Sequence, residues 1–530
     1  MQQNVLHNAI LGVKMQQTNP DLIVVLDFGA QYSQLIARRV REQKVYSKIL
    51  PFNCSANDIK ELNPKGIIFS GGPASVSEEG SPKVDEEIFK LGLPILGICY
   101  GLQVMTVQNG GEVICPVKKE YGFAKINIVA DSPIFKDVPQ DSQIWMSHGD
   151  SVSKLAPGFK VTASTPSCPY TAVENTEKQF YGVQFHPEVV HTVDGTTLLK
   201  NFILDVCKAK QNWSMSSFID NAIKEIRETV GDKQVLCGLS GGVDSSVAAV
   251  LIHRAIGDQL VCVFVNNGLL RKNEAENVQR IFGENYSIRL AYADAEDAFL
   301  DALKGVSEPE AKRKIIGKLF IDTFYGEART LGDIAFLAQG TLYPDVIESQ
   351  SAFGGPSSVI KSHHNVGGLP KDLKWKLLEP LRSLFKDEVR ELGRELGLPE
   401  NMVNRHPFPG PGLGVRCIGA ITKERLDTLR DVDDIFIEEI TKAGLYGEIW
   451  QALADLLPVK SVGVQGDKRT YREVCTLRAV TSEDAMTADW YRMPPDVLQT
   501  IASRICNEVS GVNRVLYDIT SKPPGTIEWE

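Results

Sequence analysis

The sequence predicts an α/β fold: two consecutive α/β domains with mostly parallel sheets, followed by a smaller α+β domain at the C-terminal end. Strand-like and helix-like segments alternate over residues 21–210, and the pattern restarts after the polar break KAKQNW at 208–213. A Pro/Gly-rich stretch, HPFPGPGLGVR at 406–416, marks the next break. Such alternation is typical of a mostly parallel sheet covered by helices. We therefore predict a tail and three domains: 1–20, 21–207, 208–405 and 406–530.

The composition narrows the class of protein. The 530 residues are 43% hydrophobic and 23% charged, as in ordinary globular proteins. The net charge is 57 − 67 = −10, which argues against a general nucleic-acid binder. We find no apolar run near the roughly 20 residues of a membrane span and no secretory signal, and Met15 is an alternative start. The ten scattered cysteines, without a CxxC pair, indicate a reducing cytosol, so we expect a cytoplasmic protein.

In the first domain, predicted strands and predicted helices alternate along the chain. Short apolar runs that end in glycine or polar turns predict its strands, and longer segments predict its helices. The predicted strands are DLIVVLDFG (21–29), GIIFSGGP (66–73), LPILGIC (93–99) and FYGVQFHPE (180–188), and the predicted helices are 32–43, 100–111 and 195–210.

The same sequence patterns predict the strands and helices of the two later domains. In the second, a helix at 217–231, a strand at 234–242, a helix at 245–257 and a strand at 260–268 repeat the α/β order. In the third, a predicted helix at 431–444 is mixed with strand-like segments at 459–466 and 471–480, which indicates an α+β domain.

Cys99 lies in GICYGLQ (97–103), at a predicted corner between a strand and a helix. Gly97 and Gly101 permit a tight turn there, and a cysteine that only fills a core needs no such glycines. The helix that begins near Tyr100 favours the thiolate. The backbone N–H groups of Tyr100 and of Gly72, in SGGP (70–73), are candidate donors to an oxyanion.

His186 and Glu188, in FHPE, are the candidate base and its orienting acid. At positions i and i+2 of an extended segment they share a face, so the carboxylate can hold the imidazole and stabilise its cation. A lone buried cysteine is usually a small core residue, and a lone histidine is usually structural. The combination with GxCxG and SGGP favours a Cys99–His186–Glu188 nucleophilic site.

A second chemical pattern, LSGGVDSS, follows a predicted strand and opens a predicted helix. Its glycines let the backbone approach a phosphate, its serines add donors, and Asp244 is a candidate Mg²⁺ ligand. The alternative is an ordinary βα turn, and a Walker A loop is excluded because GxxxxGK[ST] is absent. The predicted phosphate-binding residues are Ser240, Gly241, Gly242, Val243, Asp244, Ser245 and Ser246.

GICYGLQ, SGGP, QFHPE and MSHGD (146–150) together resemble class I glutamine amidotransferases. The resemblance implies that Cys99 attacks the side-chain amide of glutamine, that ammonia leaves, and that water hydrolyses the glutamyl thioester. SGGVDSS resembles the loop of ATP pyrophosphatases. That resemblance implies that ATP adenylates a carbonyl oxygen and that ammonia then displaces AMP.

Motifs beyond residue 300 resemble the glutamine-hydrolysing GMP synthases. They are EPEAKRKIIG (308–317), AQGTLYPDVIES (338–349), KSHHNVGGLP (361–370), FKDEV (385–389), HPFPGPGLGVR (406–416), VGVQGDKRTY (462–471) and TSKPPGTIEWE (520–530). The resemblance implies glutamine, ATP and xanthosine 5′-monophosphate as substrates, Mg²⁺ as cofactor, no nucleic-acid or membrane partner, and a homodimer formed by the last domain.

By the same resemblance, five residues are candidates for contacts with xanthosine monophosphate: Arg313, Asp345, Gln465, Lys522 and Glu528. The cations suit the phosphate and the others suit N–H or hydroxyl groups, whereas each alone would be taken for a solvated surface residue. Lys386 and Asp387 are candidates for lining ATP, and His363 and His364 for a lid. We also expect the terminal TSKPPGTIEWE to order over the bound nucleotide.

Two alternatives stay open at this point. One is a different ATP-pyrophosphatase amidotransferase, such as a relative of NAD or asparagine synthetases. The other is a non-catalytic nucleotide sensor, against which the intact set of Cys99, His186 and Glu188 argues. AMP formation that requires both ATP and xanthosine monophosphate would discriminate among the three.

Overall fold

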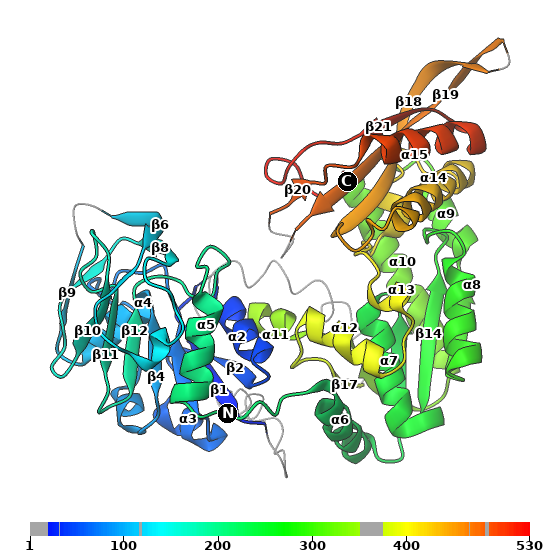
Figure 1. The fold of residues 1–530 in the computed structure, drawn as a ribbon. Coiled ribbons are helices and arrows are strands. Elements are labelled where there is room, and N and C mark those ends of the chain that lie inside the picture. The colour runs from blue at the N-terminus through cyan, green and yellow to red at the C-terminus, as the bar shows by residue number, and fades with distance from the viewer. Residues whose placement is uncertain (1–19, 31, 116–118, 350–374, 466, 483–486) are drawn as a thin grey trace. The chain divides into compact units, whose positions relative to one another are not determined.

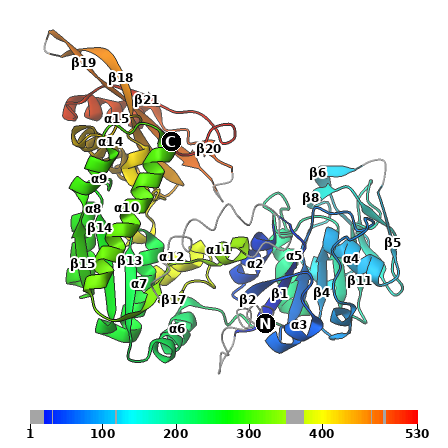
Figure 2. The same cartoon turned by 180° about the vertical axis from the view of Figure 1, so that it is seen from behind.

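The computed structural model describes residues 20–30, 32–115, 119–349, 375–465, 467–482 and 487–530. The chain forms two compact units (Figures 1 and 2). The first contains the described residues up to Phe218 and those of the segment Pro344–Ser362, and the second contains the rest. Among the described residues, every helix is too short or too polar to cross a membrane.

The first unit is built on an eight-stranded sheet with the order β2-β1-β3-β4-β12-β11-β10-β7. The five strands from β2 to β12 pair in parallel, and the last three pair antiparallel. Its strands are β1 (Leu22–Asp27), β2 (Tyr46–Pro51), β3 (Gly66–Phe69), β4 (Ile95–Ile98), β7 (Asn127–Ile128), β10 (Lys160–Ser164), β11 (Ala172–Asn175) and β12 (Phe180–Val183).

Continuous burial explains why the central strands of this sheet are apolar. Every residue of β3, β4 and β12 is buried, as expected for a parallel sheet covered on both faces. The α-helices are α2 (Ser33–Glu42), α3 (Ala56–Leu62), α4 (Tyr100–Gln108) and α5 (Gly195–Lys200), and a wider helical segment, η3 (Asn201–Val206), continues α5. Two hairpin-like pairs complete the unit: β5 (Glu112–Ile114) with β9 (Ser151–Lys154), and β6 (Glu120–Lys125) with β8 (Gln143–His148).

The second unit contains a fully parallel five-stranded sheet with the order β15-β14-β13-β16-β17. The strands are β13 (Gln234–Leu239), β14 (Leu260–Asn266), β15 (Arg289–Asp294), β16 (Ile334–Ala338) and β17 (Lys376–Leu378). The chain runs outward from β13 to β15 and then crosses to β16 on the other side of β13. The order therefore reverses beside β13, which is where open α/β sheets bind ligands.

The helices around this sheet include α7, which follows β13 directly. They are α6 (Met215–Val230), α7 (Val243–Ile256), α8 (Glu274–Val278), α9 (Glu296–Leu303), α10 (Pro309–Thr330), α12 (Lys386–Glu395) and α13 (Glu400–Val403). A further helix, α11 (Tyr343–Ser349), follows β16 along the chain. Of α11, the residues from Pro344 onward group with the first unit.

The C-terminal part of the second unit is α+β. A long antiparallel pair, β18 (Gln451–Gln465) and β19 (Lys468–Thr481), carries the short β20 (Asp489–Trp490) and the parallel β21 (Val512–Tyr517), and α14 (Lys423–Lys442) and α15 (Pro495–Glu508) pack beside it. β18 begins eight residues before the predicted strand at 459, because its first half enters the core through Ala452 and Ala454. One apolar core joins this region to α10 and β16, so the region shares its unit with the parallel sheet.

Candidate active sites

Three loops of the first unit meet at the same edge of its sheet. SGGP follows β3, Cys99 follows β4, and the segment with His186 follows β12. These strands are neighbours and run parallel, so their carboxyl ends lie at one edge. Segments that are far apart in the sequence thus form a single site.

Cys99 sits on a strained corner between β4 and α4. Its φ of 50° and ψ of −105° are uncommon for a residue with a side chain, and such strain costs about 1–3 kcal/mol. The corner depends on its glycines: a Cβ on Gly97 would lie 2.8 Å from the Gly101 carbonyl oxygen, and one on Gly101 would lie 2.6 Å from the Phe69 oxygen. The sequence therefore holds Cys99 at the sheet edge through close backbone packing.

His186 and Glu188 form a buried pair next to Cys99. The imidazole Nδ1 lies 2.7 Å from Glu188 Oε1, and the residues are only 5% and 1% exposed. Burial alone would lower the pKa of His186, but the Glu188 carboxylate and the Cys99 sulfur outweigh it and raise this pKa well above its usual value. The site thus favours an imidazolium, which is the form that stabilises a neighbouring thiolate.

The Cys99 sulfur has two further neighbours. Its thiol donates to the Ser147 carbonyl oxygen at 3.7 Å, and Gln184 Nε2 donates to the sulfur at 3.8 Å. β12 ends at Val183, earlier than the predicted strand, and the chain is held beyond it by a bond from the His186 N–H to the Trp145 oxygen. MSHGD and QFHPE therefore meet around the thiol.

The loop with Gly71 and Gly72 packs against the side chains of Tyr100 and His186. A Cβ on Gly72 would be 3.2 Å from Tyr100 Cδ1, and one on the preceding Gly71 would be 3.1 Å from His186 Cε1. Tyr100 is the first residue of α4, where backbone N–H groups have no partner within the helix. The SGGP loop therefore lies against both the imidazole and the start of α4.

In the second unit, the loop after β13 turns into α7 through Ser240 to Gly242. Gly241 has a φ of +73°, where glycine is favoured, and Gly242 caps α7. The Ser240 and Ser245 hydroxyls lie 3.1 Å apart, and Ser246 Oγ donates to the Gly242 oxygen at 2.7 Å. The start of this 14-residue helix thus presents N–H and hydroxyl groups, which suit a phosphate.

Charged side chains surround this loop. Lys386 Nζ lies 2.7 Å from both carboxylate oxygens of Asp244. Arg405 donates to the Gly241 oxygen at 2.7 Å and pairs with Glu274. The structure therefore brings the predicted Lys386 to the loop and adds two residues that the sequence did not indicate, Arg405 and Glu274.

The AQGT segment after β16 also reaches this loop. A Cβ on Gly340 would lie 3.1 Å from the backbone carbon and from the Cβ of Asp244. β13 and β16 are the neighbours beside which the strand order reverses. Asp244 therefore lies at the edge of the sheet where a ligand is expected.

The residues predicted to contact xanthosine monophosphate are divided between the two units. Arg313 Nη2 donates to the main-chain oxygen of Glu530, and both Glu528 carboxylate oxygens accept bonds from Arg416, with a further bond from Gln451. Asp345 lies on α11, in the segment that groups with the first unit.

Lys522 and Gln465 both lie in the second unit. Lys522 pairs through its backbone with Ala488, and Gln465 ends β18. His363 and His364 lie outside the described residues. The roles of these residues stay predictions.

The C-terminal tail contributes to a buried ionic network that no local sequence pattern indicates. Arg416 is fully buried and pairs with Glu528, and the equally buried Lys312 bonds the Cys417 oxygen at 2.9 Å and pairs with Glu530. Burial would lower the pKa of Arg416, but Glu528 raises it above its usual value. The tail is therefore docked on the body of the second unit through the carboxylates of its last residues.

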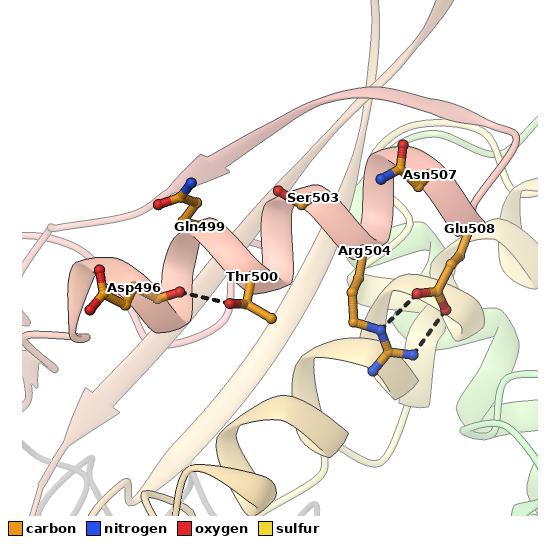
Figure 3. A pocket seen from close by; sticks show the side chains of 7 residues that line it. All are labelled: Asp496, Gln499, Thr500, Ser503, Arg504, Asn507 and Glu508. Atoms are coloured by element: carbon orange, nitrogen blue, oxygen red, sulfur yellow. Dashed lines mark hydrogen bonds and ion pairs between the residues drawn. The ribbon is translucent and has the colours of Figure 1, made fainter.

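A hollow along α15 lies away from these groups. Its lining comes from one face of a single helix, and Arg504 there pairs with Glu508, as Figure 3 shows. A surface lined by one helix lacks the converging polar groups of a ligand site. None of the predicted site residues lines it.

Comparisons with known proteins give matches in all three regions. The family of class-I glutamine amidotransferases matches residues 24–206, the NAD synthase family matches 215–314, and the GMP synthase C-terminal domain matches 438–529. Proteins named GMP synthase (glutamine-hydrolyzing) from Brachyspira hyodysenteriae and Clostridium botulinum are 59% and 58% identical, with 97% of this chain and 100% of each relative covered.

A solved structure matches part of the chain. It is that of a putative GMP synthase component from Thermoplasma acidophilum, with 30% identity over 36% of this chain and 96% of that chain, and a TM-score of 0.31.

Proposed function

The chain belongs to the family of glutamine-hydrolysing GMP synthases, and we propose that its two candidate sites divide that family's reaction between them. It aminates xanthosine 5′-monophosphate to GMP with ammonia from glutamine and with ATP as co-substrate. The reaction passes through an adenylated intermediate and releases AMP and pyrophosphate. The full-length match carries this assignment, because it spans both sites at once.

In the first unit, Cys99 is the proposed nucleophile. Its sulfur attacks the side-chain carbonyl carbon of glutamine, and the imidazolium of His186 protonates the departing ammonia. Glu188 keeps that imidazole oriented and charged through the 2.7 Å contact. The N–H groups of Gly72 and Tyr100 receive the oxyanion, and water then hydrolyses the thioester with His186 as base.

In the second unit, the loop from Ser240 to Ser246 is the proposed pyrophosphate site. Hydroxyl and backbone donors at the start of α7 compensate the charge that builds on the leaving group. Asp244 and Lys386 form an ion pair at the loop, and Arg405 holds Gly241 through its carbonyl oxygen.

Asp244 is also the proposed protein ligand of Mg²⁺. One carboxylate beside donors for phosphate fits the usual magnesium arrangement, in which substrate oxygens and water complete the shell. When bound, the ion would neutralise phosphate charge. Lys386, which holds both Asp244 oxygens here, would then be free to contact the phosphates.

Arg313, Asp345, Gln465, Lys522 and Glu528 are proposed to contact xanthosine monophosphate. The tail already holds Arg313 through Glu530, so binding of the nucleotide would exchange this contact for the nucleotide phosphate. Removing residues 521–530 would also remove Glu528 and Glu530, which pair with the buried Arg416 and Lys312, and would destabilise the unit. A point substitution, Lys522→Ala, therefore tests substrate binding more cleanly than truncation.

Three further assignments complete the proposal. The glutaminase, ATP-pyrophosphatase and C-terminal domains occupy 21–207, 208–405 and 406–530, consistent with the three family matches. The protein acts in the cytoplasm, as its scattered free cysteines favour. It forms a homodimer through its last domain, by analogy with the family.

The deciding experiment measures AMP and GMP formation by the purified full-length chain. We expect AMP only when ATP and xanthosine monophosphate are both present, and GMP with either glutamine or an ammonium salt. AMP formation with deamido-NAD or aspartate, and none with xanthosine monophosphate, would instead identify another amidotransferase of the ATP-pyrophosphatase class.

A further inference from the structure

The first unit contains a second cluster of reactive side chains that the glutaminase chemistry does not use. It consists of Glu120 at the start of β6, His148 at the end of β8, and Cys168 in the turn between β10 and β11. One potential ligand atom of each lies within 4.8 Å of the others. His148 and Cys168 are buried, and Glu120 keeps 16% of its side chain exposed.

The hydrogen bonding of His148 leaves one ring nitrogen without a partner. Its Nδ1 lies 3.0 Å from the Asp150 carbonyl oxygen, which can only accept, so Nδ1 carries a hydrogen. In the neutral ring Nε2 then presents a lone pair. Nε2 faces Glu120 Oε2 at 3.4 Å, the side chain is 4% exposed, and neither atom has a hydrogen-bond partner among the described residues.

Two acceptors facing each other in a buried place are unfavourable unless a proton or a cation lies between them. A backbone carbonyl that holds Nδ1–H and leaves Nε2 bare is also the usual outer-shell arrangement of a metal-binding histidine. His148 therefore has the orientation of a ligand.

The other two side chains are also fixed in place. Ser167 donates to Glu120 Oε1 at 2.6 Å, which leaves Oε2 for the cluster. The Cys168 N–H donates to Thr165 Oγ1 at 3.0 Å, and the Thr171 hydroxyl donates to the Cys168 carbonyl oxygen at 2.8 Å. These bonds fix the turn that carries Cys168.

The spacing selects the kind of cation. Tetrahedral zinc with bonds of about 2.0–2.1 Å to nitrogen and oxygen puts those atoms about 3.3 Å apart, close to the 3.4 Å between His148 Nε2 and Glu120 Oε2. A set of one carboxylate, one imidazole and one thiolate favours zinc-like transition metals, whereas Mg²⁺ and Ca²⁺ prefer oxygen alone. The partly exposed Glu120 offers a path of entry.

We propose that Glu120, His148 and Cys168 form a binding site for a zinc-class divalent cation, with a water molecule as fourth ligand. Binding replaces the Cys168 S–H bond by a sulfur–metal bond and releases the proton to solvent. The site adjoins the glutaminase, because Ser147, next to His148, accepts the hydrogen bond of the Cys99 thiol. The cation would anchor the end of β8 against the nucleophile.

Cobalt(II) titration of the full-length chain tests the site, since thiolate-to-cobalt charge transfer reports a sulfur ligand. The titration uses the Cys99→Ala background, so that the nucleophile cannot bind the probe. We expect one equivalent of Co²⁺ and a charge-transfer band, both lost in Cys168→Ser and weakened at least tenfold in affinity by Glu120→Gln. Cys115→Ser, which alters an exposed thiol, is the matched control and should change neither.

A measurement without substitution in the cluster keeps the test valid if Cys168→Ser fails to fold. X-ray absorption of the zinc-loaded chain should show one sulfur at about 2.3 Å and nitrogen or oxygen ligands at about 2.0–2.2 Å. A first shell without sulfur, the absence of stoichiometric binding at micromolar Zn²⁺, or a cobalt band that survives Cys168→Ser in a folded protein would each overturn the proposal.

Discussion

The two candidate active sites of this chain are prepared to different degrees. In the first unit, His186 and Glu188 are buried and already paired beside the sulfur of Cys99. In the second, Ser240 is exposed and its hydroxyl bonds Ser245, and Asp244 is neutralised by Lys386. The candidate site of the first unit is thus assembled from its own side chains, whereas the loop from Ser240 to Ser246 satisfies its polar groups through contacts within the second unit.

Physical chemistry accounts for this difference. A thiolate nucleophile needs a base and an orienting acid in fixed geometry, and burial strengthens the interactions among them. A phosphate brings several negative charges of its own, so a loop that binds it needs only accessible donors and the positive end of a helix. Substitutions in the first unit should therefore affect one nitrogen source, and substitutions at the loop should affect both.

The largest expected effect is that of Cys99→Ala. The variant should lose glutamine-dependent GMP synthesis by about 10⁴-fold or more, as expected on loss of a covalent nucleophile, while ammonia-dependent synthesis stays near that of the wild type. Initial rates with glutamine and with ammonium chloride at saturating ATP provide the measurement. Equal loss with both nitrogen sources would show that the two sites are not separate.

Asp244→Asn should act on both nitrogen sources. Losing the charge that holds Lys386 and the proposed Mg²⁺ should lower the rate by about 10²-fold or more, or roughly 3 kcal/mol of transition-state stabilisation. Steady-state assays with either nitrogen source measure it. Asp258→Asn, an exposed acid just beyond the other end of α7, is the matched control and should be silent. Ammonia-dependent turnover within about threefold of the wild type would refute the assigned role.

Glu188→Gln tests the difference between the two sites through the pH dependence of activity. Burial opposes the charge of His186, so without the carboxylate its raised pKa should fall, and the basic limb of the kcat/KM profile with glutamine should move to lower pH. We expect a loss of about 10²-fold at neutral pH, and an unchanged profile with ammonia.

The pair of His186 and Glu188 also determines how the stability of the folded protein changes with pH. A raised folded pKa contributes stability that is complete below the unfolded value of about 6.5 and is lost as pH rises through the folded pKa. Wild-type unfolding midpoints should therefore fall relative to those of Glu188→Gln as pH increases from 6.5. A basic limb that does not move in the variant would mean that Glu188 does not set the charge of His186.

The sequence predicted the strand–turn–helix corners better than the contacts between distant segments. Gly97 and Gly101 around Cys99, and Gly241 before α7, indicated tight turns because their local patterns already require close backbone approach. Arg405 carried no such signal. Its bond to the Gly241 oxygen joins residues 164 positions apart, and only the tertiary fold brings them together.

The contacts of the C-terminal tail also join segments that are far apart in the sequence. Its polar, proline-rich composition alone would indicate a frayed end, but Glu528 and Glu530 dock on Arg416 and Lys312. Those two cations are fully buried, and nothing in their local sequence distinguishes them from surface residues. Buried ion pairs of this kind depend on burial that only the folded chain reveals.

The smallest expected effect concerns a buried acidic residue. Glu188 in the first unit and Asp455 in the second differ in the partners of their carboxylates. Glu188 has a cationic partner, whereas Asp455 on β18 is fully buried and neither of its carboxylate oxygens has a hydrogen-bond partner among the described residues. Burial raises the pKa of Asp455 well above its usual value, although Arg416 and Arg478 oppose this shift. The folded state therefore binds a proton that the unfolded chain releases near pH 4.

It follows that stability falls as pH rises from about 4 through the raised pKa of Asp455. Asp455→Asn should remove this decline and stabilise the protein at neutral pH by about 1 kcal/mol or more, since each unit of pKa shift is worth 1.36 kcal/mol. Urea midpoints of the two proteins between pH 5 and 8 provide the measurement. Asp518→Asn is a control of opposite sign: although burial opposes it, hydrogen bonds from Thr520 and the charge of Arg478 lower the pKa of Asp518, so its removal should destabilise and matter less as pH falls. If Asp455→Asn instead destabilises the protein at pH 8, Asp455 is ionised there and stabilises the buried arginines Arg416 and Arg478. Buried acids in both units would then be charged and paired with cations.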